Sequence, residues 1–230
     1  ILRRDQGYIG VLIDDLVTKG TNEPYRMMTS RSEYRLILRQ DNAADRMVPI
    51  GHKVGLVSEE RYSKFLDEKR ICEEELLRIK SVVVHPTEEV NEMLVRKGTS
   101  PITTGVRMIE LLKRPQLGYE DLAEFDPGRP KMKYSLVNKL EVEIKYSGYI
   151  RVQQEQIDKM RKLESKSLPE NIDYKTIKGL RLEAQEKLNK FKPLNVGQAG
   201  RISGVNPADV SVLLVWLASK EHGSRGDNNE

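Results

Sequence analysis

A long helical pattern runs from Ser135 to about Ser165 without a proline. Apolar side chains recur along it at the helical period, as they do when one face of a helix is buried. These side chains are Leu136, Leu140, Ile144, Ile150, Ile157, Met160 and Leu163. At 1.5 Å per residue the helix would be roughly 45 Å long. An element of this length predicts a mostly α-helical protein with a C-terminal helical bundle.

Further helical patterns precede and follow the long one. Ser58 suits an N-cap, because Glu59 and Glu60 would complement the helix dipole in the first turn. Thr87 is a second N-cap candidate, and Gly98 suits the end of that helix. We expect helices over residues 58–80, 87–98, 104–114, 119–125 and 174–191.

Two short helices are predicted at the C-terminal end of the chain. Asn195 can cap the first, and Gly204 closes it. Asn206, Pro207 and Asp209 are the residues typical of the cap and first turn of a second helix. The residues from Val210 to Leu217 are almost wholly apolar, so either the core or a partner must cover them.

The N-terminal part has a pattern that differs from these helical patterns. Residues 8–13 are β-branched and aromatic and predict a short strand or a buried turn, and Tyr34–Leu38 predicts a strand. The first 55 residues therefore read as a short mixed α/β segment. With the turn at Asp126–Pro130 as a boundary, we expect four parts: residues 1–55, a helical subdomain 56–134, the bundle 135–222 and a disordered tail 223–230.

Composition and motifs exclude several functional classes. No apolar run reaches the length of a membrane span, and the lone Cys72 and three scattered histidines predict no metal site. The dinucleotide fingerprint G-x-G-x-x-G, the P-loop and H-E-x-x-H are all missing. The sequence therefore offers no recognisable dinucleotide, phosphate-loop or zinc motif.

The strongest chemical signal is a set of arginines: Arg26, Arg31, Arg35 and Arg39. The last three recur every four residues, which places them on one face of either a strand or a helix. Guanidinium groups bind phosphates, and Tyr25 and Tyr34 could stack on bases. The alternative is a salt-bridged surface with the neighbouring acidic residues Glu23, Glu33, Asp41 and Asp45.

A second signal lies around Gly204. The stretch 202–210 reads as helix, glycine turn and helix, which loosely resembles the helix-hairpin-helix element that binds DNA phosphates through turn amides. Only Arg201 is a nearby basic side chain. Farther away, residues 151–192 carry 11 basic and seven acidic side chains, which permits nucleic-acid binding without requiring it.

Four long stretches together resemble one family. They are residues 8–21 (YIGVLIDDLVTKGT), 23–42 (EPYRMMTSRSEYRLILRQDN), 149–153 (YIRVQ) and 195–215 (NVGQAGRISGVNPADVSVLLV). The family is the FAD-dependent tRNA uridine 5-carboxymethylaminomethyl modification enzymes, also called the glucose-inhibited division protein A family. Departures are small: Ser32 and Gly200 stand where Ala and Ser are expected, and Met28 where Phe is usual.

The resemblance implies that this chain is a C-terminal fragment of such an enzyme. Its first 55 residues would belong to the edge of a missing FAD-binding domain. The whole enzyme would bind FAD, use NADH and methylene-tetrahydrofolate, and modify the wobble uridine of tRNA. It would form a homodimer and assemble with a tRNA-modification GTPase into a heterotetramer. It would work in the cytoplasm and would not bind membranes. The resemblance further implies that this fragment holds no catalytic and no cofactor-binding residues, and that the fragment alone would be inactive.

The resemblance also implies roles for residues of this chain. tRNA binding falls to Arg26, Arg31, Tyr34, Arg35 and Arg39. The residues expected to bind the GTPase are Asn195, Gly197, Arg201, Ile202, Gly204, Val205, Asp209, Leu213 and Trp216. Two alternatives stay open: a stand-alone helical RNA- or DNA-binding module and a structural helical adaptor.

Overall fold

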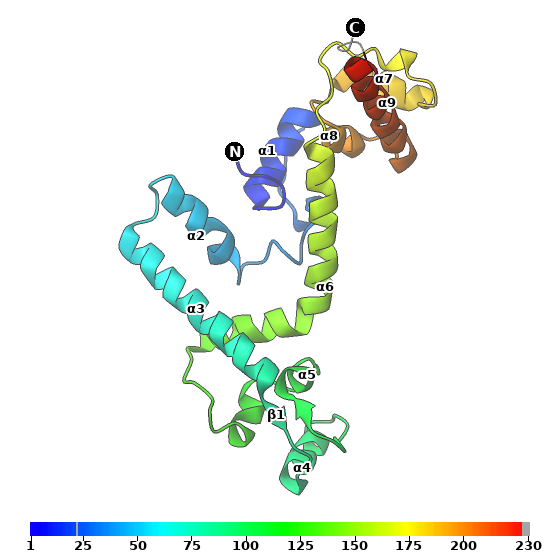
Figure 1. Cartoon of the computed structure of the whole chain (residues 1–230). Helices are drawn as coiled ribbons and strands as arrows, with labels where there is room; N and C mark the ends of the chain where they lie inside the picture. Colours follow the sequence, from blue (N-terminus) through cyan, green and yellow to red (C-terminus); the bar gives the residue numbers. More distant parts are fainter. Residues whose placement is uncertain (22, 227–230) are drawn as a thin grey trace. The chain divides into compact units, whose positions relative to one another are not determined.

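The computed structural model describes residues 1–21 and 23–226, with side chains up to residue 220. These residues are mostly helical, which confirms the predicted fold class (Figure 1). They form two compact units, which we call unit 1 (Ile1–Arg35 with Gln153–Glu230) and unit 2 (Leu36–Val152). The domain boundaries predicted from the sequence stay a prediction.

Among its described residues, unit 2 contains four complete α-helices, the first part of a fifth, a 3-10 helix and a small sheet. Strands β1 (Val83–Val84) and β2 (Val106–Arg107) pair antiparallel, with Val84 opposite Val106. The long helix α6 (Tyr134–Glu164) begins in unit 2 and ends in unit 1. The other elements of unit 2 are α2 (Ala43–Lys53), α3 (Glu59–Ser81), α4 (Glu88–Arg96), α5 (Met108–Leu112) and the 3-10 helix η2 (Glu120–Phe125).

The core of unit 2 is formed by the facing sides of α3, α4, α5 and α6. Its completely buried members include Ile79, Leu94 and Leu111, and α6 contributes Leu140 and Ile144. The apolar positions that repeat at the helical period are therefore the ones that are buried in this core.

A buried carboxylate ties α3 to the segment that follows α5. Glu75 accepts a hydrogen bond from the Tyr119 hydroxyl at 2.6 Å and from Arg78 Nε at 2.7 Å. Arg78 Nη1 also donates to Asp126 at 2.8 Å, and the Arg129 guanidinium lies over the Tyr119 ring. Burial raises the pKa of Tyr119, and its hydrogen bond to Glu75 raises it further.

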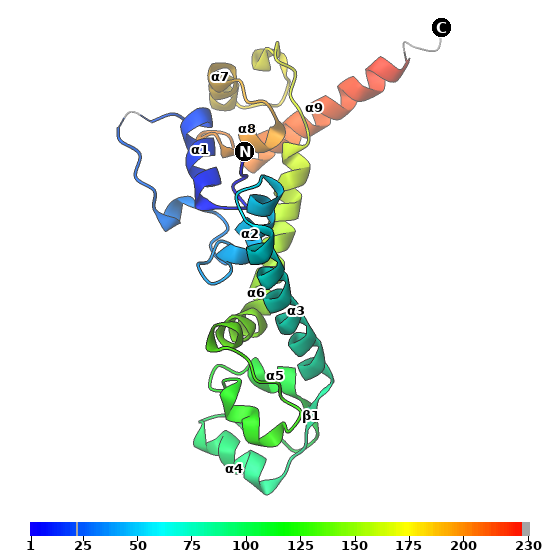
Figure 2. The same ribbon diagram turned by 90° about the vertical axis from the view of Figure 1, so that its left-hand side faces the viewer.

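Unit 1 packs short helices around the C-terminal end of α6 (Figure 2). A buried apolar cluster joins Leu168, Leu188, Val196, Ile202 and Leu213. The elements of unit 1 besides the end of α6 are α1 (Tyr8–Thr18), the 3-10 helices η1 (Thr29–Arg31) and η3 (Tyr174–Thr176), α7 (Leu182–Phe191), α8 (Val196–Arg201) and α9 (Pro207–Gly226). Residues 223–226 of the predicted disordered tail belong instead to α9, and residues 227–230 lie outside the described residues.

The capping predictions are confirmed. The side chains of Ser58, Thr87 and Asn195 accept hydrogen bonds from backbone amides in the first turns of α3, α4 and α8. Asn206 and Asp209 each accept a hydrogen bond from the other's backbone amide at 2.9 Å. The sequence therefore marks the starts of these four helices through local hydrogen bonding.

Both predicted strands in the N-terminal part are wrong. Residues 8–13 belong to helix α1, in which Val11 and Asp15 are buried four residues apart. A short apolar run does not distinguish a strand from a buried helix. Residues 35–37 form a turn, and none of residues 34–38 belongs to a strand.

Two helix predictions are right only in part. Within 104–114, residues 106–107 pair as strand β2 and only Met108–Leu112 is helical. Within 174–191, a 3-10 turn and an irregular stretch precede α7, because Gly179 adopts a φ of +93° that a helix cannot contain. Among the described residues, no helix is both long and apolar enough to cross a membrane.

Candidate functional site

Three of the four predicted arginines are free of carboxylate partners among the described residues. Arg26, Arg31 and Arg35 are exposed and form no ion pair there. Arg31 lies with its guanidinium 4.4 Å from the centre of the Tyr25 ring, and its Nε donates to the Arg26 carbonyl at 3.1 Å. The salt-bridge alternative therefore does not fit these three residues.

Arg39 behaves differently from the other arginines. Its Nη2 and Nε pair with Asp41 at 2.9 and 3.0 Å, so the salt-bridge alternative fits this residue. It belongs to unit 2, whereas Arg31 and Arg35 belong to unit 1. The expectation of one shared face is wrong, because it assumed regular secondary structure and residues 32–39 form turns and extended backbone.

Tyr34 is not available to stack on a base. Its side chain is only 7% exposed, and burial raises the pKa of its hydroxyl. The amide of Tyr34 donates to the hydroxyl of buried Ser32 at 3.2 Å. The aromatic residue at the surface of this segment is Tyr25 instead.

The arginine-bearing segment is held by a residue that the sequence reasoning missed. Arg4 is 6% exposed and forms a two-point hydrogen bond with Glu33, at 2.7 Å from Nη2 and 3.2 Å from Nε. Its Nη1 donates to Asp15 at 2.7 Å and to Asp14 at 3.0 Å. A buried guanidinium is stable only when it is paired in this way. One arginine thus joins α1 to the segment around Glu33.

The pKa values of the groups around Arg4 reflect this pairing. Burial alone would lower the pKa of Arg4, but the hydrogen bonds and charges of Glu33 and Asp15 hold it above its ordinary value. Burial would raise the pKa of Asp15, but hydrogen bonds from Tyr25, Lys19 and Arg4 lower it to about 2. Tyr25 donates to Asp15 at 2.7 Å, so the same carboxylate also holds the start of the segment.

The ion pairs continue from α1 to α6 and α8. Arg201 of α8 pairs with Asp14 of α1 at 3.2 Å and with Glu164 of α6 at 2.7 Å. Arg161 of α6 pairs with Asp5. The two views of the ribbon agree that α1 and α8 lie side by side. We call Arg4, Asp14, Asp15, Glu33, Arg201 and Glu164 the ionic hub.

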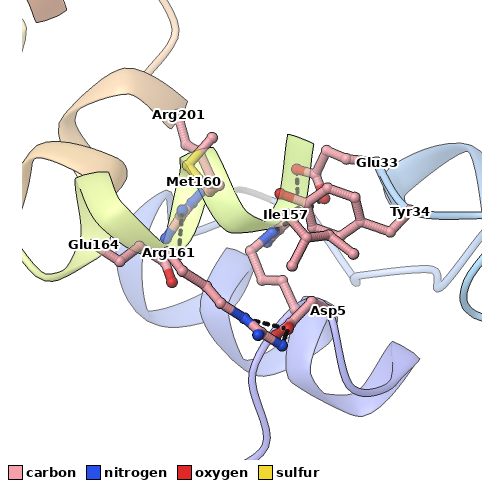
Figure 3. Close-up of a pocket in the computed structure, with 9 residues that line it drawn as sticks. Asp5, Glu33, Tyr34, Ile157, Met160, Arg161, Glu164 and Arg201 are labelled. Carbon is pink, nitrogen blue, oxygen red and sulfur yellow. Dashed lines mark hydrogen bonds and ion pairs between the residues drawn. The ribbon is translucent and has the colours of Figure 1, made fainter. Parts of the chain in front are cut away.

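Figure 3 shows several of these side chains around a small pocket. Arg201 and Glu164 lie on one side of it, and Glu33 and Tyr34 lie on the other. The pocket has a volume of about 30 Å³, which is far too small for a nucleotide or a flavin. Its walls carry both signs of charge, so the ionic hub is a structural connection rather than a binding cavity.

Most residues predicted for partner docking serve the fold. Ile202 and Leu213 are buried, and Gly197 packs so tightly that an added Cβ would lie 2.5 Å from Glu164 Cγ. Asp209 is 1% exposed and binds Arg181 at 2.7 Å. Asn195 caps α8. Only Gly204, Val205 and Trp216 are partly exposed without such a role in a cap or an ion pair.

The turn at Gly204 does not resemble a phosphate site. Its φ of +99° requires glycine, and its carbonyl accepts a hydrogen bond from Arg181 at 2.9 Å. A Cβ at this position would lie 2.6 Å from a carboxylate oxygen of Glu183. A carboxylate packed on the turn repels a phosphate, so the comparison with the DNA-binding hairpin is disfavoured.

An apolar groove lies between η3 and α9. Val215 is 71% exposed on α9, and the groove beside it has a volume of about 540 Å³. Its walls are Thr176, Ile177, Lys178, Ser211, Val212, Val215, Trp216 and Ser219. The other apolar residues of α9 pack against the core of unit 1. The core thus covers most of the apolar surface of this helix, and the remainder around Val215 is exposed along the groove.

The helical units, the long α6 and the unpaired arginines define a class of protein: a helical region that carries a segment of exposed arginines. Comparison with known proteins makes this specific. A family model described as "tRNA modifying enzyme MnmG/GidA C-terminal helical domain" matches residues 59–154. A second, described as "tRNA modifying enzyme MnmG/GidA C-terminal helical bundle", matches residues 156–230. The chain belongs to the MnmG/GidA family.

Individual relatives agree with the family models. The tRNA uridine 5-carboxymethylaminomethyl modification enzyme MnmG of Caldicellulosiruptor saccharolyticus is 57% identical over 98% of this chain and 36% of its own length. The enzyme of the same name from Clostridium kluyveri is 54% identical over 96% of this chain and 35% of its own. The chain thus spans about a third of the length of these relatives.

A solved structure supports the same fold. Aquifex aeolicus GidA, in its form II crystal, superposes with a TM-score of 0.73 at 40% sequence identity. The superposition covers 94% of this chain and 33% of the GidA chain. The predicted family and the predicted helical C-terminal architecture are therefore confirmed.

Proposed function

We propose that this chain is the tRNA-contacting and partner-docking part of an enzyme that modifies the wobble uridine of tRNA. The observation that carries the proposal is the segment Tyr25–Arg35. Three of its guanidinium groups face solvent without a carboxylate partner among the described residues, although acidic side chains are abundant nearby. The names of the relatives supply the substrate class.

Guanidinium groups in this state suit a phosphate backbone. They stay charged at every physiological pH and can donate two hydrogen bonds to one phosphate. Neutralising phosphates releases counterions, so binding weakens as salt rises, with a slope that counts the contacts. Arg26 and Arg35 are contact candidates, and Arg31 presents the outer face of a guanidinium that lies on Tyr25.

A salt titration tests this role. The affinity of the complete protein for a tRNA transcript is measured at several salt concentrations, for wild type and for the variant Arg31→Gln/Arg35→Gln. Each lost phosphate contact should reduce the log–log slope by about 1. The control is Arg70→Gln, because Arg70 is an exposed arginine of α3 already paired with Glu74. Equal affinity and slope in wild type and double variant would contradict the proposal.

The groove on α9 supports a second part of the proposal, the docking of a GTPase. Val215 is a large apolar side chain left 71% exposed beside a groove of about 540 Å³. Exposed apolar patches of this kind are typical of protein–protein contact sites. Of the expected docking residues that are partly exposed, Trp216 lines this groove.

The redox chemistry belongs to the rest of the enzyme in this proposal. FAD, NADH and methylene-tetrahydrofolate would bind outside this chain, and the complete enzyme would act in the cytoplasm as a homodimer. The described residues do not fit a flavin dinucleotide, because their sheet has two strands of two residues each and no glycine-rich phosphate loop follows either.

A further inference from the structure

The arginine-bearing segment has little apolar burial to hold its shape. Met28 is 49% exposed, and between residues 23 and 35 only Ser32 and Tyr34 are buried. Its one helical turn, η1, has three residues and none of them is buried. Such a segment loses considerable conformational entropy when it is ordered, so polar connections must hold it.

Arg4 supplies the most extensive of these connections. On one side its Nη1 reaches Asp14, Asp15 and the carbonyl of Val11, all in α1. On the other side its Nη2 and Nε bind Glu33, and Nη2 also reaches the carbonyl of Arg31 at 3.4 Å. The contacted backbone carbonyl belongs to one of the three unpaired arginines themselves.

Arg4 cannot act as a phosphate contact. Its side chain is 6% exposed, and three carboxylates surround it. The pairing of Arg4 with Glu33 also affects the charge of the surface that carries the arginines. Glu33 lies between Arg31 and Arg35 and is 44% exposed, so without Arg4 it would present an unpaired negative charge among the arginines.

We propose that Arg4 is a positioning residue for tRNA binding. By holding Glu33 and the Arg31 carbonyl against α1, it orders the segment and pairs the Glu33 carboxylate, which would otherwise compete for the neighbouring guanidinium groups. This inference rests on the proposed tRNA-binding role of Arg31 and Arg35. Preorganisation raises affinity because ordering is completed before binding. A positioning residue alters affinity without altering the number of phosphates neutralised.

The test compares affinity with salt slope in the complete protein, using a tRNA transcript as the probe. Arg4→Lys keeps the charge but loses the two-point geometry. Glu33→Asp keeps the charge but shortens the side chain by one methylene. Each variant should bind tRNA about three- to tenfold more weakly, with the wild-type salt slope. Because both substitutions disrupt the same contact, the double variant Arg4→Lys/Glu33→Asp should bind tRNA no more weakly than either single variant.

A matched control separates this role from general destabilisation. Arg181→Lys changes another arginine–carboxylate pair of unit 1, with Asp209, and neither residue lines the pocket beside Glu33 and Tyr34. It should leave affinity and slope unchanged. Hydrogen exchange adds an independent readout: amides of residues 25–35 should exchange faster in Arg4→Lys and at the wild-type rate in Arg181→Lys. Because Glu33 is partly exposed, Glu33→Asp keeps the test valid if Arg4→Lys fails to fold.

The outcomes distinguish this inference from the proposed function. If folded Arg4→Lys and Glu33→Asp bind like wild type while Arg31→Gln/Arg35→Gln binds weakly, the positioning role is wrong and the tRNA-binding role stands. A smaller salt slope in Arg4→Lys would make Arg4 a phosphate contact and would also overturn the inference. If Arg31→Gln/Arg35→Gln retains both affinity and slope, the proposed function falls, and the inference falls with it.

Discussion

Arg4 and Glu33 are separated by 28 residues in the sequence and are joined by two hydrogen bonds, of 2.7 and 3.2 Å. The contact links the start of the chain to the middle of its arginine-rich motif. It explains why an acidic residue stands between Arg31 and Arg35 without neutralising either of them. The same guanidinium also binds Asp15, whose titration provides a test of the hub.

The ionic hub should make unit 1 sensitive to acid. Asp15 has a pKa of about 2 when folded, against an ordinary value of 3.8. Its stabilisation is therefore complete above about pH 4 and is lost as the pH falls toward 2. A lowering of this size corresponds to about 2 kcal/mol at neutral pH. Chemical unfolding at several pH values should show Asp15→Asn less stable at pH 7 and less acid-sensitive below pH 4.

An exposed carboxylate gives the control for this pH series. Asp67→Asn on α3 removes a charge that is 65% exposed, and it should keep the wild-type acid dependence. If Asp15→Asn loses stability between pH 4 and pH 2 as steeply as wild type, the pairing of Asp15 with Arg4, Lys19 and Tyr25 does not hold in solution.

The polar cluster of unit 2 should be far more sensitive to truncation than a surface ion pair. Arg78→Ala leaves Glu75 and Asp126 buried without their cation, since their side chains are 1% and 4% exposed. We expect a loss of about 3 kcal/mol in the free energy of unfolding measured in urea. Arg70→Ala breaks an exposed pair on the same helix and should cause no measurable change. Equal effects of the two variants would contradict the burial of this cluster.

Two helical glycines should respond oppositely to alanine. At Gly10 in α1, an added Cβ would lie 2.2 Å from the carbonyl oxygen of Arg3, so Gly10→Ala must displace the backbone next to Arg4. At Gly148 in α6 nothing lies within 4 Å, and alanine should stabilise the helix by about 0.5–1 kcal/mol. Thermal unfolding should therefore show a lower Tm for Gly10→Ala and a higher Tm for Gly148→Ala. The same direction in both would refute the close approach at Gly10.

The groove on α9 predicts a specific effect on protein docking. Val215→Glu places a charge on a side chain that is 71% exposed, so the fold should tolerate it. Binding of the partner GTPase should weaken about tenfold or more, the equivalent of about 1.4 kcal/mol. Val95→Glu on α4 is the control, because Val95 is a comparably exposed valine of unit 2. Undiminished binding by folded Val215→Glu would place the docking surface elsewhere.

The parts of the fold that sequence reasoning predicted are those with local causes. Ser58 and Thr87 cap helices through bonds to residues three positions away, and Asn206 with Asp209 does the same for α9. The apolar period of α6 likewise needs no knowledge of partners. By contrast, residues 8–13 are a short apolar run, and only their packing in unit 1 selects the helix.

The candidate site shows the same division between local and long-range causes. Composition and spacing indicated Arg26, Arg31 and Arg35, but they could not indicate Arg4, whose partners lie up to 29 positions away. The sequence predicts base stacking for Tyr34 because aromatic residues stack on bases in RNA-binding proteins, and no local pattern signals that its side chain is buried. A buried arginine at one end of a motif leaves no local signal.

The most direct test of the central claim is a hydrogen-exchange footprint of the complete protein with and without tRNA, at low salt. The account predicts that protection by tRNA includes the amides of residues 25–35. Helix α4 (Glu88–Arg96), which begins with two glutamates in its first turn, should show none and serves as the internal reference. Exchange in residues 25–35 that is identical with and without saturating tRNA would contradict the account.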